Sequence, residues 1–258
     1  MRIPETIAVA FAMFSALPVP QPVWNEKNMR YALCAFPLVG AVIGLCWWGW
    51  AALAGALALP APLRAAGLCL LPVLITGGIH LDGYADTSDA LASCAEPEKK
   101  QAILKDPHCG AFAVIRLISW FIACWALAAA LTPTPRALLC MGLAFVLERA
   151  LSGLAVTAFP LAKNTGLAHT FATAADKRTV QIVLGLLCAL LVVGLAAAGG
   201  LAGLAMAGAA GLALWRYYRV AKTQFGGISG DLAGWFLQRA ELWMLAALVA
   251  CQYAGGCG

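Results

Sequence analysis

The chain has 258 residues, of which 62% are hydrophobic and only 11% are charged, and its mean hydropathy is +0.84. Soluble domains carry roughly 25% charged residues, so this composition excludes an ordinary soluble domain and indicates an integral membrane protein. In such a protein the net charge of +5 reports topology and does not indicate a nucleic-acid partner. Barrel-length alternation of apolar and polar residues is absent, so we predict an all-α, polytopic helical bundle forming one domain over residues 1–258.

The N-terminal stretch is apolar from Ile7 to Leu17 and then breaks at prolines. It lacks a convincing Ala-x-Ala cleavage site, so we interpret it as a retained, short re-entrant or interfacial segment and not as a signal peptide. A membrane-spanning helix needs about 20 apolar residues. About seven candidate spans follow, at 31–58, 64–79, 112–131, 137–158, 180–197, 199–217 and 235–254.

The charged residues gather on one side of these spans. The side that carries the 80–111 loop holds all of the 17 Lys and Arg residues except Arg64 and Arg136, and the acidic residues lie there too. Loops rich in Lys and Arg stay in the cytoplasm, so we predict that this side is cytoplasmic and carries the chemistry.

The segment GGIHLDGYADTSDA, residues 77–90, follows the second span and contains Asp82, Asp86 and Asp89. Their i, i+4, i+7 spacing places all three on one stripe of a helix, within roughly 60°. Three carboxylates on one stripe repel one another, and their hard oxygens suit Mg²⁺, Mn²⁺ or Ca²⁺. The alternatives are a metal site and a solvated polar helix end. His80 is either a ligand or substrate contact, or an interfacial residue bonded to the backbone.

Three further polar segments lie on the same side. Lys105 and Asp106 precede the third span, where they either meet a phosphate and complete the acidic site or form a turn. Arg149 stands beside Glu148 inside an apolar run, and its guanidinium is well suited to phosphate. Further glycines and ionisable residues follow in the last two polar loops and the helix after them: Lys163, Gly227, Gly230, Asp231 and Glu241. Acids for a metal, cations for phosphate and glycines for close approach suit phosphoryl-group transfer.

Five segments together resemble the cobalamin synthase family, also called adenosylcobinamide-GDP ribazoletransferase, over nearly the whole chain. They are FSALPVP at 14–20, FPLVGAVIG at 36–44, GGIHLDGYADTSDAL at 77–91, LKDPHCGAF at 104–112 and GGISGDLAG at 226–234. The third is similar to the signature segment of the family and is the most specific. The chain departs from the family pattern outside the aspartate cluster, at Pro107, Glu148, Ser229, Leu232 and Gln238.

The resemblance implies a multi-pass enzyme of the cytoplasmic (inner) membrane that joins adenosylcobinamide-GDP to α-ribazole or its 5′-phosphate. It releases GMP, needs Mg²⁺ and gives adenosylcobalamin or its phosphate. Such an enzyme is surrounded by membrane lipid. The resemblance is also compatible with a homo-oligomer and with contacts to other corrinoid-assembly enzymes.

Resemblance and spacing together give hypotheses for individual residues. Asp82, Asp86 and Asp89 would hold Mg²⁺ against the diphosphate. The other assignments are Asp106 and Asp231 as weaker ligand or general-base candidates, Lys105, Arg149 and Lys163 on phosphate oxygens, His80 as an orienting group, and Gly227, Gly230 and Glu241 near the substrate.

Two other classes fit less well. CDP-alcohol phosphotransferases and intramembrane prenyltransferases use aspartate motifs that this chain lacks in part, because no Arg follows Asp82-Gly83 and a second aspartate-rich segment is missing. An ion-coupled transporter would use the aspartates as a cation or proton site, but the sequence shows no internal repeat.

Overall fold

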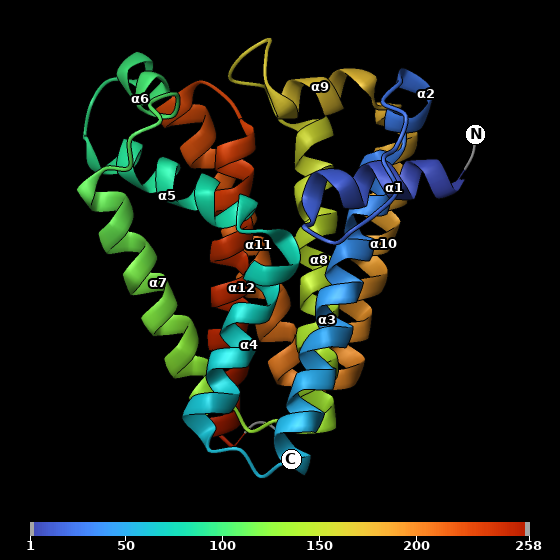
Figure 1. Ribbon diagram of the computed structural model, residues 1–258, viewed down its shortest axis with the longest axis vertical. Coiled ribbons are helices and arrows are strands. Elements are labelled where there is room, and N and C mark those ends of the chain that lie inside the picture. The colour runs from blue at the N-terminus through green and yellow to red at the C-terminus, as the bar shows by residue number, and fades with distance from the viewer. Residues whose placement is uncertain (1–2, 256–258) are drawn as a thin grey trace.

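A computed structural model describes residues 3–255, and these residues form twelve helices and no strand (Figure 1). The helices are α1 Ile3–Phe14, α2 Glu26–Met29, α3 Ala32–Ala56, α4 Ala61–Thr76, α5 Ile79–Ala92, α6 Pro97–Ile103, α7 Ala111–Ala130, α8 Pro135–Ala158, α9 Leu167–Ala174, α10 Lys177–Gly199, α11 Leu201–Phe225 and α12 Gly230–Tyr253. The predicted all-α fold is therefore confirmed.

The long helices run side by side along the long axis of the molecule, and the short helices gather at one end (Figure 1). α2, α6 and α9 lie at that end, while α1 and α5 lie across the long helices just below it. At the opposite end the connections are short, and only Gly200, with φ of 56°, separates α10 from α11. The short helices and long loops are therefore confined to one end of the bundle.

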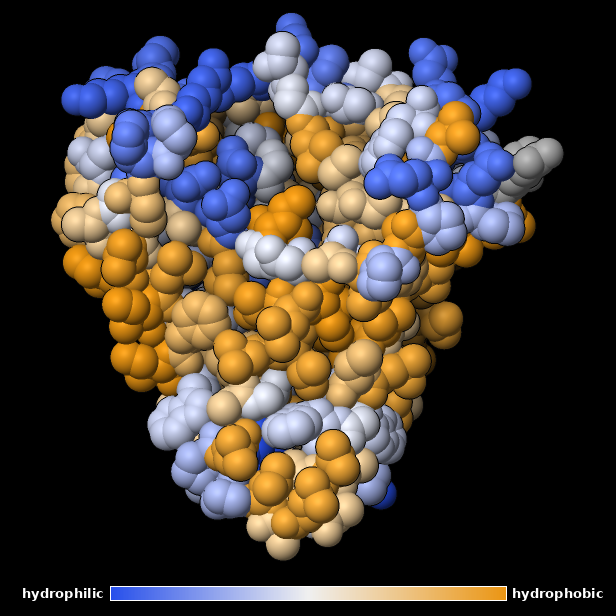
Figure 2. Space-filling view, viewed as in Figure 1, coloured by the Kyte–Doolittle hydropathy of each residue, from blue (hydrophilic) through white to orange (hydrophobic). Residues whose placement is uncertain are grey.

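Hydrophobic side chains form a broad band below this polar end (Figure 2). Four helices, α3, α7, α8 and α10, are long and apolar enough to cross a membrane. α4 and α5 pass the same test only as a pair, and they are bent by 96°. The protein is thus a multi-pass membrane protein, but the expected number of about seven spans is too high by this criterion. α11 and α12 are long helices at the expected places, but they carry several charged residues and do not qualify.

The centre of the bundle is α8, which packs against α3, α10 and α12. Glycines let the α3 and α8 backbones approach closely. A β-carbon at position 40 would lie 2.2 Å from the Phe145 carbonyl oxygen, and one at position 44 would lie 2.8 Å from the Cα of Gly142. Small residues drive such close crossings in membranes, where helix association gains little from the hydrophobic effect.

The second predicted span, 64–79, is broken. Gly77 and Gly78 both adopt left-handed backbone conformations, with φ of 66° and 79°, which residues with side chains adopt rarely. The Gly78 N–H donates to the Val73 carbonyl at 3.1 Å and closes α4. The chain then turns sharply into α5, so the aspartate-bearing segment lies across the bundle and does not continue the span.

Candidate functional site

α5 is held against the start of α12 by two glycines. A β-carbon at Gly83 would lie 2.7 Å from the Asp231 carbonyl oxygen, and one at Gly234 would lie 2.7 Å from the His80 carbonyl oxygen. Only residues without side chains allow this approach of two backbones. The crossing brings Asp231 of α12 next to the aspartate stripe of α5, which lies about 150 residues earlier in the chain.

The predicted stripe forms as a helix, and its carboxylates interact with one another. Asp82 is exposed and Asp86 is partly buried. Asp82, Asp89 and Asp231 all lie close enough to Asp86 for their charges to repel it. Asp82 and Asp86 also line one cavity of about 520 Å³, together with the Gly77–Gly78 turn, α7 and residues 107–109. This cavity and its carboxylates are the acidic site.

Asp89 has a structural partner that the sequence pattern did not indicate. Its Oδ1 accepts a hydrogen bond from the Ala113 N–H at 3.3 Å, and Gly110 leaves room for its carboxylate. A carboxylate at a helix N-terminus satisfies free N–H groups and complements the helix dipole. Asp89 therefore joins α5 to the start of α7.

The pairing of two loops brings Lys163 near Asp231, while its ammonium donates to the Gln101 carbonyl at 3.4 Å. The Ala162 N–H donates to the Ile228 carbonyl at 2.9 Å, and the Ile228 N–H donates to the Pro160 carbonyl at 2.8 Å. Gly227 is required there, because a β-carbon would lie 2.4 Å from the Leu161 carbonyl carbon. The pairing carries Lys163 within electrostatic reach of Asp231.

The charge on Lys163 is sensitive to its surroundings. Partial burial lowers the pKa of the Lys163 ammonium, and the nearby positive charge of Lys105 lowers it further. The negative charge of Asp231 opposes both effects. Two of the predicted phosphate-binding lysines therefore lie together beside a predicted acid.

Asp106 lies on the exposed loop before α7. Its Oδ1 accepts from the His108 N–H at 3.0 Å and contacts the His108 ring at 2.7 Å. These contacts, the backbone N–H first, lower the pKa of the Asp106 carboxyl. His108, with Pro107 and Cys109, lines the acidic site, so the predicted turn also forms one wall of the cavity.

Arg149 does not reach the acidic site. It is 1% exposed, pairs with Glu148 and donates to the Phe145 carbonyl at 3.0 Å. Glu241 and His80, both buried, lie within electrostatic reach of it. Glu148 and Arg149 are adjacent on α8, both are buried and their charges pair, so the predicted contact of Arg149 with phosphate is not available at the acidic site.

His80 and Glu241, expected near the substrate, belong to this buried network. His80 is 6% exposed, its ring lies 5.9 Å from that of Phe36, and its Nδ1 atom has no hydrogen-bond partner. Asp82, two residues later, is exposed instead. On α5, the side chains that pack into the bundle and those that form the acidic site therefore project from opposite faces of the helix.

Gly230 begins α12 behind the N-cap Ser229, whose hydroxyl accepts from the Leu232 N–H at 3.3 Å and donates to the Asp231 carboxylate at 3.4 Å. The predicted glycine-rich turn into a helix is present. It orients Asp231 towards α5 and Lys163.

The donor set of the acidic site fits a hard divalent cation. No three His, Cys, Asp or Glu side chains converge on one point anywhere in residues 3–255. Mg²⁺, however, commonly binds through one or two carboxylates, with water and substrate phosphates completing its shell. Asp82 and Asp86, on one cavity wall with excess negative charge, supply such a pair.

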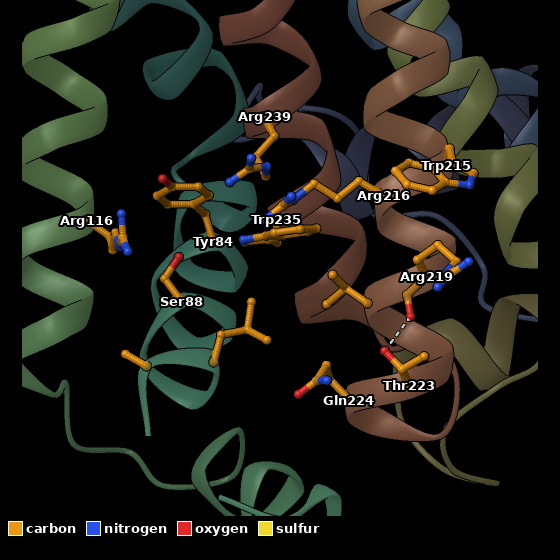
Figure 3. A pocket seen from close by; sticks show the side chains of 13 residues that line it. Tyr84, Ser88, Arg116, Trp215, Arg216, Arg219, Thr223, Gln224, Trp235 and Arg239 are labelled. Atoms are coloured by element: carbon orange, nitrogen blue, oxygen red, sulfur yellow. Dashed lines mark hydrogen bonds between the residues drawn. The ribbon is translucent and has the colours of Figure 1, made fainter. Parts of the chain in front are cut away.

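Sequence reasoning missed a second cluster on the other side of α5. Arg116, Arg216, Arg219 and Arg239 surround a separate cavity with Tyr84 and two tryptophans (Figure 3). Arg116 and Arg239 lie inside apolar runs, and Arg216 stands between Trp215 and Tyr217. Isolated arginines in predicted membrane helices were the available signal.

The helical bundle, with its ionisable groups gathered at one end, defines a multi-pass membrane protein that has an acidic site beside phosphate-compatible lysines. A family model for cobalamin-5-phosphate synthase matches residues 6–249, and the chain belongs to this family.

Curated relatives align with this chain over almost their whole length. An adenosylcobinamide-GDP ribazoletransferase of Lachnoclostridium phytofermentans is 42% identical over 96% of this chain and 94% of its own. Proteins of the same name from Geobacillus kaustophilus and Desulfitobacterium hafniense are 31% and 33% identical over 93% and 92% of this chain, and over 96% and 93% of their own. No solved structure matches the chain.

Proposed function

We propose that this protein joins adenosylcobinamide-GDP to α-ribazole or α-ribazole 5′-phosphate and releases GMP. Family membership over residues 6–249 names the reaction class. The observation in the structure that supports it is that Asp231 lies within electrostatic reach of both Asp86 and Lys163, so that the acids of α5 and a lysine of a distant loop are near one another. These residues come from three separate segments, two of them in the motifs that resemble the family.

The reaction is the transfer of a substituted phosphoryl group. A ribose hydroxyl of α-ribazole attacks the phosphate attached to cobinamide and forms a new P–O bond. The bond from that phosphorus to the bridging oxygen breaks, and GMP leaves with that oxygen. The hydroxyl proton must pass to a base, and Asp231 lies beside the site for this role. Lys163 and Lys105 would offset the charge that gathers on the leaving phosphate.

Mg²⁺ is part of the proposal. Asp82 and Asp86 would hold it, and when bound it would neutralise negative charge on the diphosphate. Asp89 is the weakest of the three predicted ligands, because it already caps α7.

The distribution of Lys and Arg residues supports a proposal for the orientation of the protein in its membrane. We propose the cytoplasmic (inner) membrane, with the polar end facing the cytoplasm, because nearly all Lys and Arg residues lie at that end. The substrates would then reach the acidic site from the cytoplasmic side. Partners beyond the substrates, and any homo-oligomer, remain predictions of the resemblance.

The test is an assay with purified full-length protein, adenosylcobinamide-GDP, α-ribazole and Mg²⁺, in which GMP release is measured. Wild-type protein should release GMP only when α-ribazole is present. Asp82→Asn keeps shape and removes one charge, and we expect at least about a hundredfold slower turnover, an effect of the size found when one group that stabilises charge in a transition state is removed.

The matched control is Asp176→Asn. Asp176 is a carboxylate at the same end of the molecule, but it caps α10 and pairs with Arg30 at 2.6 Å. Asn is an equally good N-cap, so this variant should keep its activity. Equal activities of the two variants would exclude the proposed role of the acidic site.

A further inference from the structure

A second large cavity lies across α5 from the acidic site. Its volume is about 690 Å³, and α5, α7, α11 and α12 contribute its walls (Figure 3). Tyr84 and Ser88 line it from α5, whereas Asp82 and Asp86 line the acidic cavity. The two cavities therefore share one helix as a partition and present different chemistry on its two faces.

The cavity is strongly cationic. Arg116 of α7, Arg216 and Arg219 of α11, and Arg239 of α12 line it, and no acidic residue does. Among residues 3–255, none of the four arginines has an ion-pair partner. Arg116, Arg216 and Arg219 are exposed and Arg239 is partly buried, so their mutual repulsion is screened in part by solvent. An anion bound among the four positive charges would still be stabilised.

Arg239 is the deepest of these cations. Its guanidinium carbon lies 4.8 Å from the ring centre of Trp235 and 4.6 Å from that of Trp243, and its buried Nε has no hydrogen-bond partner. The aromatic rings hold the side chain by cation–π contact but accept no hydrogen bond from Nε. Arg239 is partly buried, and a cation at this depth that is held by two aromatic rings and has no anionic partner is a candidate for ligand binding.

The chemistry of the lining selects a class of ligand. Arginine forks match the oxygens of a phosphate group and bind it bidentately. Trp215 and Trp235 add flat apolar surface next to the cations, and Tyr84 and Ser88 add hydroxyl groups. Small-molecule sites commonly have volumes of about 300–1,000 Å³, so a phosphate with an attached organic group fits the space.

We propose that this cavity is a second anion site that binds a phosphate ester, separate from the acidic site across α5. An anionic phospholipid headgroup and a soluble nucleotide monophosphate share this chemistry. Binding is measured without turnover, so this proposal and the proposed reaction can fail independently. GMP is also the product of the proposed reaction, so assignment to this cavity depends on the difference between the cavity variant and its control.

The experiment uses the full-length protein and two probes. One arm measures binding of phosphatidylglycerol against phosphatidylcholine by native mass spectrometry from nanodiscs, and the other titrates GMP by calorimetry in detergent. The test variant is Arg216→Gln combined with Arg219→Gln, since both side chains are exposed and their replacement leaves the core intact. Lys222→Gln is the matched control, because Lys222 lies on the same helix, is exposed and does not line the cavity.

We expect the double variant to lose at least about tenfold in affinity for one probe, while Lys222→Gln stays within about twofold of wild type. Loss for phosphatidylglycerol alone assigns a lipid headgroup, and loss for GMP alone assigns a nucleotide phosphate. The proposal is overturned if wild-type protein binds neither probe, or if the double variant and the control bind both equally well.

Discussion

The close crossing of α5 and α12 at Gly83 provides the sharpest test of how the acidic site is positioned. In Gly83→Ala the new β-carbon would start 2.7 Å from the Asp231 carbonyl oxygen and 2.8 Å from its Cα. Ordinary contact begins at 3.4 Å, so the helices must separate by about 0.7 Å locally. Both neighbouring atoms are backbone and cannot rotate away.

Two opposing terms set the stability change. Alanine favours a helix by about 1 kcal/mol over glycine, whereas overpacking costs about 1–3 kcal/mol. The net loss is therefore modest, about 0–2 kcal/mol. The effect on activity should be larger, because misplacing reacting groups by about 1 Å costs up to a hundredfold. We expect kcat to fall by about tenfold or more, as Asp231 moves away from Asp86.

GMP release and thermal unfolding in detergent measure the two quantities on one preparation. Gly208→Ala is the control, because a β-carbon at that helical position meets nothing within 4 Å. It should keep wild-type activity and be as stable as wild type or slightly more stable. Wild-type kcat in Gly83→Ala would refute the idea that this backbone approach positions the carboxylates.

Three further changes test other parts of the site. Asp89→Ala should destabilise the protein by about 1 kcal/mol through loss of the α7 cap, while Asp89→Asn, which keeps an acceptor, should be nearly as stable as wild type and retain activity. Glu148→Gln should lower the free energy of unfolding by up to about 3–5 kcal/mol, because it removes the ion-pair partner of the buried Arg149 and leaves only Glu241, which makes no ion pair with it, to offset the charge. Lys105→Gln removes a charge that lowers the pKa of Lys163, so KM for adenosylcobinamide-GDP should begin to rise at a higher pH than in wild type.

Each of these has an opposite outcome. Inactive but stable Asp89→Asn would restore this residue to the set of metal ligands. An unchanged unfolding temperature in Glu148→Gln would mean that other groups compensate the Arg149 charge. Identical pH profiles with and without Lys105 would show that Lys105 does not affect the step in which Lys163 takes part.

The sequence alone determined the class of protein, the polar end and the acidic helix. Hydropathy and charge distribution are properties of the chain itself, so they indicated a helical membrane protein before any packing was known. The spacing of Asp82, Asp86 and Asp89 predicted a helical stripe, and α5 confirms the helix. The motif segments indicated the family that the comparisons show.

Only the tertiary structure decided which polar residues meet. The bend at Gly77–Gly78 turns α5 across the bundle, and no local pattern gives the direction of such a turn. Its direction brings Asp231 to the stripe, assigns Asp89 to α7 and directs His80 into the core. The cationic cavity is likewise formed by arginines on three helices, one each on α7 and α12 and two on α11, and the sequence does not show that they face one space. Contacts between distant segments depend on helix crossing geometry, which periodicity along one helix does not encode.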